Sequence, residues 1–205
     1  MLFDHHPSTV NENGHLEIGN VDTIYLARKY GTPLYVYDVS LIRKNCRSFV
    51  DAFKALNVKA QVAYASKAFS SIAILQVVNQ ENLSLDVVSE GELYTALRAG
   101  FPTEKIHFHG NNKTESELKM AIEHKIGCIV IDNFYEIDLL DRLLRESDQS
   151  MDVLIRVTPG IEANTHEYIM TGNEDSKFGF CLSNGQADRA FQRLKNHPYL
   201  KFKGL

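Results

Sequence analysis

The chain has 205 residues, 44% of them hydrophobic and 23% charged, and its formal net charge is −4. This composition predicts a packed, soluble globule. The lack of a basic excess argues against a nucleic-acid partner, and no apolar run approaches the roughly 18 residues that a membrane span needs.

The N-terminal residues and the cysteines indicate a cytoplasmic protein. The segment MLFDHHPSTVNENG is polar and lacks the apolar core of a signal peptide. The cysteines are odd in number and far apart, at Cys46, Cys128 and Cys181. They predict neither a disulfide framework nor a zinc site, and the adjacent His5 and His6 are too weak a pattern to predict a metal site.

From about residue 33 onward, short apolar runs alternate with longer amphipathic segments. Strands are predicted at residues 33–38, 61–67, 83–89, 105–110, 128–133, 152–159 and 201–205. Helices are predicted between them, for example at 41–56 and 114–125. Three capping boxes mark helix starts, at Ser89 and Glu92, Thr114 and Glu117, and Ser183 and Gln186. Alternating strands and helices indicate βαβ units and a parallel sheet.

The predicted strands end at regular intervals. Lys67, Asp86, His109, Asp132 and Arg156 follow one another at spacings of 19, 23, 23 and 24 residues. This period favours a (β/α)8 barrel of the TIM type over a doubly wound sheet, because the GxGxxG fingerprint of the latter is absent. A complete barrel takes about 250 residues, so the chain is expected to hold about six of the eight strands, as the first part of a longer protein.

Lys67 ends the apolar segment QVAYASK. On a strand, Ala63, Ala65 and Lys67 share one face, and the two alanines leave open space in front of the lysine. At the C-terminal mouth of a barrel, where ligands bind, partial burial would favour the neutral amine, which can form a Schiff base with an aldehyde or ketone. The alternative is a lysine that reaches solvent from a strand end, and the pattern alone does not decide between the two.

Three further residues at strand ends are candidates for the same site. Asp86 would place an anion beside Lys67, although an ordinary loop aspartate is the alternative. His109 could stack on a planar ligand or hydrogen-bond to it, and the alternative is a polar loop histidine, which is the role expected for His107. Arg156 lies between apolar residues and needs an anionic partner, for which Asp86 is a candidate.

The segment 158–186 is long for a connection between a strand and a helix. Long ordered loops at this face of a barrel often carry function, and a solvated insertion is the alternative interpretation. Its candidate residues are Glu162, His166, Tyr168, Glu174, Asp175 and Lys177.

From about residue 32 to residue 205, the chain resembles the meso-diaminopimelate decarboxylase family, pyridoxal-phosphate enzymes with the fold type III, alanine-racemase-like barrel. The resemblance rests on segments that occur in the same order: YASKAF, LDVVSEGELYTALRAGF, IHFHGNNKTESEL, IDNF and LIRVTPGIEANTHEYIMTG followed by SKFGF. The block TPGIEANTH, TG and SKFG favours this family over the related ornithine and arginine decarboxylases.

The resemblance implies pyridoxal 5′-phosphate as cofactor, and decarboxylation of meso-2,6-diaminopimelate to L-lysine and carbon dioxide. The cofactor-carrying lysine of the family matches Lys67, and Asp86 and His109 match residues near the cofactor. Arg156 matches an arginine that holds the aspartate or the cofactor in place. Lys177 matches a lysine at the dimer interface or the mouth of the site.

The resemblance also implies a homodimer for the full-length enzyme, in which residues 1–32 join a β-domain and residues 33–205 form part of the barrel. Members of the family continue with an HxHIGSQ-type strand, a glycine-rich phosphate-binding turn, an EPGR segment and a β-domain with a catalytic cysteine and a tyrosine. We therefore expect residues 1–205 alone to be poorly folded and inactive.

Three alternatives stay open. The first is another pyridoxal-phosphate enzyme of the same fold, an ornithine or arginine decarboxylase or an amino-acid racemase. The second is a cofactor-free barrel aldolase that uses Lys67 for its Schiff base. The third is a non-catalytic homologue that binds a decarboxylase partner, because a fold does not fix a function.

Overall fold

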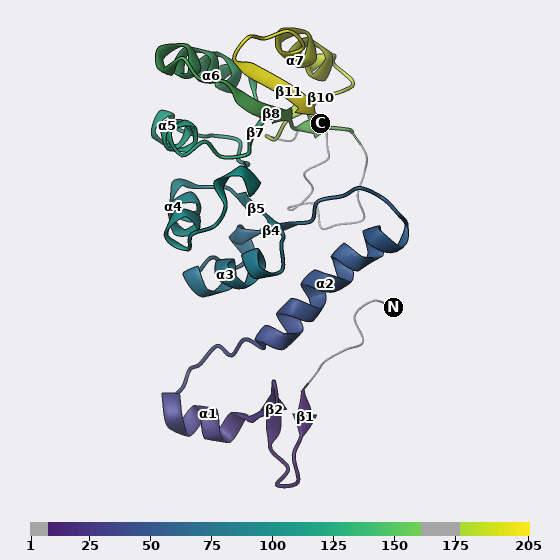
Figure 1. Ribbon diagram of the computed structural model, residues 1–205, viewed down its shortest axis with the longest axis vertical. Coiled ribbons are helices and arrows are strands. Elements are labelled where there is room, and N and C mark those ends of the chain that lie inside the picture. The colour runs from purple at the N-terminus through teal and green to yellow at the C-terminus, as the bar shows by residue number, and fades with distance from the viewer. Residues whose placement is uncertain (1–7, 161–176) are drawn as a thin grey trace. The chain divides into compact units, whose positions relative to one another are not determined.

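The computed structural model describes residues 8–160 and 177–205 (Figure 1). The chain divides into two compact units, Met1–Val62 and Ala63–Leu205. The predicted division after residue 32, between an N-terminal segment and the barrel, concerns the domains of a longer protein and stays a prediction. None of the helices in the described residues is long and apolar enough to cross a membrane.

The first unit contains a small antiparallel sheet and two helices. The strands are β1 (Thr9–Val10), β2 (Leu16–Ile18) and β3 (Val21–Asp22), and the helices are α1 (Thr23–Tyr30) and α2 (Val39–Ala55). The helix predicted at 41–56 is confirmed as α2. The strand predicted at 33–38 is wrong, because these residues form no strand and the apolar side chains from Leu34 to Tyr37 are exposed.

The second unit is built on a parallel sheet of six strands in the order β11-β8-β7-β6-β5-β4. The strands are β4 (Ala63–Ala65), β5 (Ser84–Val87), β6 (Ile106–Phe108), β7 (Cys128–Ile131), β8 (Met151–Ile155) and β11 (Leu200–Gly204). The six predicted strands from residue 61 onward are thus confirmed, mostly with shorter bounds. The predicted strand 152–159 is interrupted at Arg156, and a separate two-stranded parallel sheet pairs β9 (Val157–Thr158) with β10 (Phe180–Cys181).

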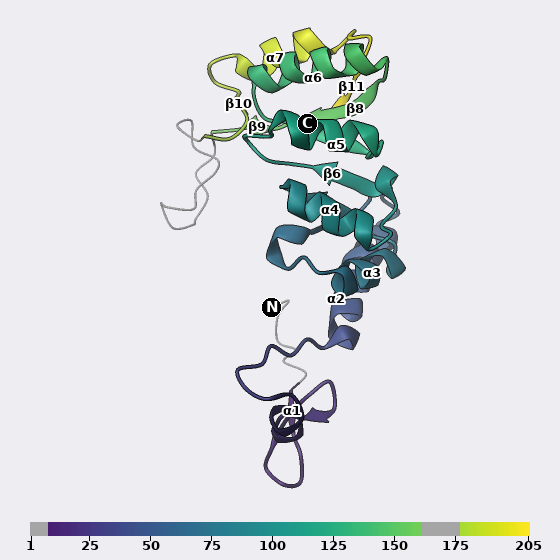
Figure 2. The same ribbon diagram turned by 90° about the vertical axis from the view of Figure 1, so that its left-hand side faces the viewer.

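Helices cover one face of the six-stranded sheet. They are α3 (Ile72–Gln80), α4 (Glu90–Arg98), α5 (Glu115–Glu123), α6 (Phe134–Ser147) and α7 (Gln186–Leu194). Figures 1 and 2 show α3 to α6 in a row along this face. The strand side chains that alternate onto it are apolar and at most 1% exposed: Leu85, Val87, Ile106, Phe108, Ile129, Ile131, Val153 and Ile155. Burial of these side chains against the helices is the main stabilising contribution to this unit. The alternate side chains of the strands point to the opposite face of the sheet.

Helix starts follow two of the three predicted capping boxes. Thr114 caps α5 in a complete box, in which Glu117 binds back to the Thr114 N–H. Ser89 caps α4, but the Glu92 carboxylate accepts from the Val88 N–H instead. The box predicted at Ser183 is wrong, because the N-cap of α7 is Gly185 in the left-handed conformation, and the Gln186 N–H donates to the Asn184 side chain at 3.0 Å.

His197 lies in the connection between α7 and β11, and its side chain is 14% exposed. Its Nδ1 accepts from the backbone N–H groups of Tyr199 and Leu200, at 3.3 and 3.0 Å. Nε2 therefore carries the ring proton, 3.2 Å from an Asp141 carboxylate oxygen. Burial lowers the pKa of His197, and two nearby arginines add to the effect against the opposing pull of Asp141.

We expect His197→Asn to reduce the loss of stability on acidification. The unfolded chain takes up a proton as the pH falls through about 6.5, whereas the folded state resists it, so stability is present above that pH and lost below it. An asparagine keeps an acceptor and cannot titrate. Urea unfolding between about pH 7 and about pH 5 measures the difference, with the exposed His124→Asn as control. An equal loss of stability in parent and variant would contradict this.

Candidate functional site

A cavity of about 960 Å³ opens at the carboxyl ends of the strands. Lys67, Asp86, His109 and Arg156, the four residues predicted for one site, all line it. Its apolar wall includes Val88, Val130, Leu154, Val157 and Leu182. The fold brings these residues together because parallel strands end at the same edge of the sheet, so that residues about two dozen positions apart become neighbours.

Lys67 lies on a 3-10 turn, Ser66–Ala68, directly after β4. The expected strand alternation therefore ends at Ala65, and the lysine is exposed rather than partly buried. The turn is fixed by Ser66, which is fully buried and whose single hydroxyl proton lies within hydrogen-bonding reach of both the Asp86 carbonyl, at 2.8 Å, and the Glu92 carboxylate. The backbone of Lys67 is thus anchored, while its side chain lines the cavity, where its amine can reach a ligand.

Asp86 lies between two histidines of the neighbouring strand end. One carboxylate oxygen is 3.2 Å from His107 Nδ1 and 3.5 Å from His109 Nε2. Burial alone would raise the pKa of Asp86, but the two histidines outweigh it and hold the pKa well below its usual range. Asp86 is therefore an anion at neutral pH. His107, expected to be a loop residue, lies in β6 in register with Asp86.

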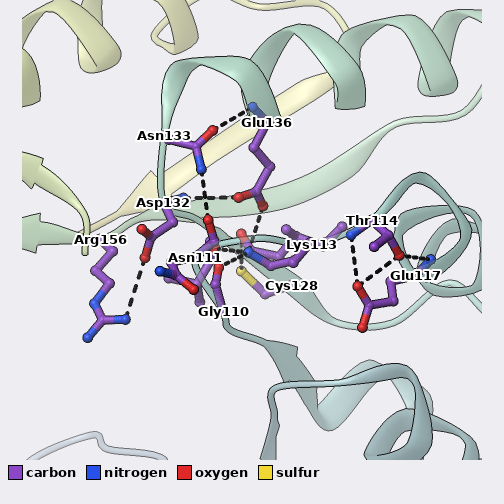
Figure 3. A network of polar contacts seen from close by, with 12 residues as sticks. Gly110, Asn111, Lys113, Thr114, Glu117, Cys128, Asp132, Asn133, Glu136 and Arg156 are labelled. Atoms are coloured by element: carbon purple, nitrogen blue, oxygen red, sulfur yellow. Dashed lines mark hydrogen bonds and ion pairs between the residues drawn. The ribbon is translucent and has the colours of Figure 1, made fainter. Parts of the chain in front are cut away.

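Arg156 follows β8 and has a different partner from the one proposed from the sequence. Its guanidinium is 3.5 Å from a carboxylate oxygen of Asp132 (Figure 3). It also lies over the Phe178 ring, 4.2 Å from the centroid. The Asp132 side chain is 3% exposed, and its second oxygen accepts from the Gly179 N–H at 2.9 Å. The expected pairing of Arg156 with Asp86 is thus replaced by a pairing with Asp132.

Gly179→Ala is expected to disturb this arrangement more than Gly185→Ala. Both glycines have almost the same backbone angle, φ +72° and +73°, so each alanine costs about 1–2 kcal/mol in strain. Only at Gly179 would a Cβ meet backbone, the Arg156 carbonyl oxygen at 2.7 Å. We expect overpacking there to add about 1–3 kcal/mol. Urea unfolding of the two variants measures the difference, and equal losses would contradict the prediction.

A buried ion pair, not singled out in the sequence, lies beside these residues. Lys113 Nζ is 2.7 Å from Glu136 Oε1, and the two side chains are 1% and 3% exposed (Figure 3). Burial raises the pKa of Glu136, and the Lys113 ammonium opposes that shift. The available sequence signal was a charged residue in the first turn of an otherwise apolar helix face, at Glu136.

The candidate residues Glu162, His166, Tyr168, Glu174 and Asp175 lie outside the described residues. Lys177 is described. Its ammonium lies 5.2 Å from the centroid of the Phe178 ring, and its carbonyl accepts from the Asn111 side chain at 3.5 Å. Among the residues that the structure describes, no group of three histidine, cysteine or acidic side chains could hold a metal ion.

A family model and closely similar known sequences point to the same family of enzymes. The family model described as "Pyridoxal-dependent decarboxylase, pyridoxal binding domain" matches residues 39–205. Diaminopimelate decarboxylase of Bacillus subtilis is 62% identical over 204 residues, which are 100% of this chain and 46% of that protein. The Staphylococcus aureus enzyme of the same name is 48% identical, over 95% of this chain and 46% of its own length. The chain thus spans about half the length of the curated relatives it matches.

Solved structures agree with the sequence comparison. Diaminopimelate decarboxylase of M. jannaschii superposes with a TM-score of 0.87 at 33% identity, covering 96% of this chain and 46% of that one. The Helicobacter pylori enzyme, solved in complex with L-lysine, gives 0.82 at 29% identity, covering 89% and 46%. The predicted fold, a partial barrel of the TIM type, is confirmed, as is the resemblance. The chain belongs to the pyridoxal-dependent decarboxylase family, whose pyridoxal binding domain its residues 39–205 match.

Proposed function

We propose that the chain supplies the pyridoxal 5′-phosphate-binding part of a meso-diaminopimelate decarboxylase. That enzyme would convert meso-2,6-diaminopimelate into L-lysine and carbon dioxide. The observation that carries the proposal is the convergence of Lys67, Asp86, His109 and Arg156 on one cavity, in a chain that is 62% identical to diaminopimelate decarboxylases.

The residues of the cavity fit this cofactor. Its volume is several times that of one planar ring, and its wall combines apolar side chains with a few polar groups, as cofactor sites do. Lys67 offers an amine that can bind the cofactor through its aldehyde. His109 offers an imidazole to the ring, and Arg156 offers a permanent positive charge to an anionic group.

The cofactor, when bound, supplies an electron sink for the bond that breaks as carbon dioxide departs. The residues of this chain orient the reactants and set the charges around them. Asp86, ionised and held by two histidines, favours a positively charged nitrogen beside it. Asp132 and the Phe178 ring fix the guanidinium of Arg156 at the cavity wall.

The partners and the compartment follow from the same proposal. The substrate is an amino acid, and the complete enzyme is a homodimer, with Lys177 at the subunit interface or the mouth of the site. The cytoplasm is the compartment that we propose, because the cysteines Cys46, Cys128 and Cys181 are few, odd in number and far apart in the sequence, which is typical of proteins in a reducing compartment.

Carbon dioxide release by the complete protein that carries this chain tests the proposal. We expect release from meso-diaminopimelate and much less from ornithine or arginine. Preference for ornithine or arginine, or racemisation without carbon dioxide release, would identify another enzyme of the fold. Turnover without pyridoxal phosphate would support the cofactor-free aldolase. Absence of both activity and cofactor uptake would favour a non-catalytic homologue.

A further inference from the structure

The Lys113 ammonium has three polar partners inside the protein, two backbone carbonyls and one carboxylate. Nζ donates to the Gly110 carbonyl at 2.7 Å and the Val130 carbonyl at 2.8 Å, and it is paired with Glu136 at 2.7 Å. An ammonium has three donors and no acceptor. One side chain therefore ties together the loop after β6, the strand β7 and the first turn of α6.

The loop that Lys113 holds borders the cavity. His109, Gly110 and Asn111 all line it, and Gly110 has φ +118°, a conformation that residues with a side chain rarely adopt. The Gly110 carbonyl is bound by Lys113, and the Asn111 carbonyl accepts from the Asn133 side chain at 3.1 Å (Figure 3). Two successive carbonyls of the loop are thus held by separate side chains.

Glu136 links Lys113 to Asp132 and so to Arg156, which also lines the cavity. Its second oxygen accepts from the Asp132 N–H at 3.2 Å, and the Asp132 side chain is the partner of Arg156. The pair therefore contacts the backbone that presents His109 and the residue that holds Arg156. Neither Lys113 nor Glu136 is among the residues that line the cavity, so neither is placed to touch a ligand there.

Stability alone is a weak reason for such a pair. Buried ion pairs are often replaced by apolar residues of similar size without loss of stability, because desolvation offsets the attraction. Apolar residues cannot replace the hydrogen bonds to two carbonyls and the ion pair to a carboxylate, which together fix the backbone positions. The role of the Lys113–Glu136 pair is therefore to hold the backbone of these segments in position.

We propose that Lys113, together with Glu136, is a positioning residue for the cofactor site, fixing residues 109–111 and the end of β7 so that His109 and Arg156 face the cavity. The proposal rests on the proposed function, because it concerns how pyridoxal phosphate is bound. It assigns the pair a measurable effect on cofactor affinity without contact to the cofactor.

The test uses the complete protein with the double substitution Lys113→Met and Glu136→Met, which removes both charges and leaves no unpaired ion. Three quantities are measured: the dissociation constant of pyridoxal phosphate by its absorbance, the melting temperature, and amide hydrogen exchange of residues 109–111 without cofactor. The control is Lys119→Met. Lys119 also pairs with a glutamate, Glu115, at 2.7 Å, but the two side chains are 59% and 43% exposed.

We expect the double variant to melt within about 3 °C of the parent, to bind the cofactor about tenfold more weakly or worse, and to exchange faster at residues 109–111. The control should match the parent in all three measurements. Unchanged affinity and exchange in the double variant would overturn the positioning role. A large drop in melting temperature would also overturn it and assign the pair to stability. If the parent itself takes up no pyridoxal phosphate, the proposed function fails, and this proposal falls with it for that separate reason.

Discussion

If the proposed function holds, replacement of Lys67 by alanine in the complete protein is expected to abolish covalent attachment of pyridoxal phosphate and to lower kcat at least about a thousandfold. Lys67 brings an amine to the cavity from a turn whose backbone is anchored through the buried Ser66. Among the described residues that line the cavity, Lys67 is the only one with an amine side chain. Lys119→Ala, on the exposed side of α5, serves as the control and should leave kcat unchanged.

Mass spectrometry checks the attachment independently of turnover. Borohydride makes a bond between a lysine amine and pyridoxal phosphate permanent, so the peptide that contains Lys67 should gain the mass of the reduced cofactor. The variant should show no such peptide. A cofactor adduct on a different lysine, or retained activity in the Lys67→Ala variant, would contradict the assignment.

The single substitution Lys113→Met is expected to destabilise the protein by about 3–5 kcal/mol. It leaves the Glu136 carboxylate buried at 3% exposure without its cation, and such uncompensated charges are costly. Adding Glu136→Met should recover most of the loss, because the unpaired charge is then gone. Urea unfolding of the parent, the single variant and the double variant measures both steps.

Equal losses of unfolding free energy in the single and the double variant would contradict this explanation. If the single and double variants lose the same free energy, the destabilisation comes from the missing bonds to the Gly110 and Val130 carbonyls and not from an orphaned carboxylate. Lys119→Met is again the matched comparison and should cause no measurable change, since exposed pairs contribute little.

The strands of the second unit could be predicted because their signals are local. Runs such as CIVID and LSLDVV are apolar on the face that helices cover, and capping residues such as Thr114 and Ser89 follow them closely. The run PLYVYD at 33–38 carries a similar composition but forms no strand. A strand needs a neighbour to pair with, and composition does not say which segment has one.

The position of the candidate site could also be predicted from the strand ends, but the local conformation of its residues could not. A barrel places consecutive strand ends side by side, so Lys67, Asp86, His109 and Arg156 were expected to share a site, and they line one cavity. The conformation after β4 was not predictable, because Lys67 lies on a 3-10 turn fixed by the distant Glu92.

Partners within the site were harder to predict than positions. Arg156 pairs with Asp132 and not with Asp86, and Asp86 is taken by two histidines. Lys113 and Glu136 are 23 residues apart in the chain and become partners only through the packing of neighbouring units. Pairings of this kind depend on side-chain geometry, which leaves no periodic trace in a single sequence.

The order of the strands has a consequence for how the second unit is made. From β4 to β8, each strand pairs with the one before it, and β11 then adds to β8. From β5 to β8, each new strand finds its pairing edge already formed by a segment about 20 residues earlier, which keeps the loops that must close short. Only β11 pairs with a strand further back, since Leu200 lies opposite Met151. The sheet can therefore grow by one unit at a time while the ribosome is still synthesising the chain. Two polar contacts, Lys113 with Glu136 and Arg156 with Asp132, each join one strand–helix repeat to the next, so in such vectorial assembly we expect each of them to form only after the later repeat has docked.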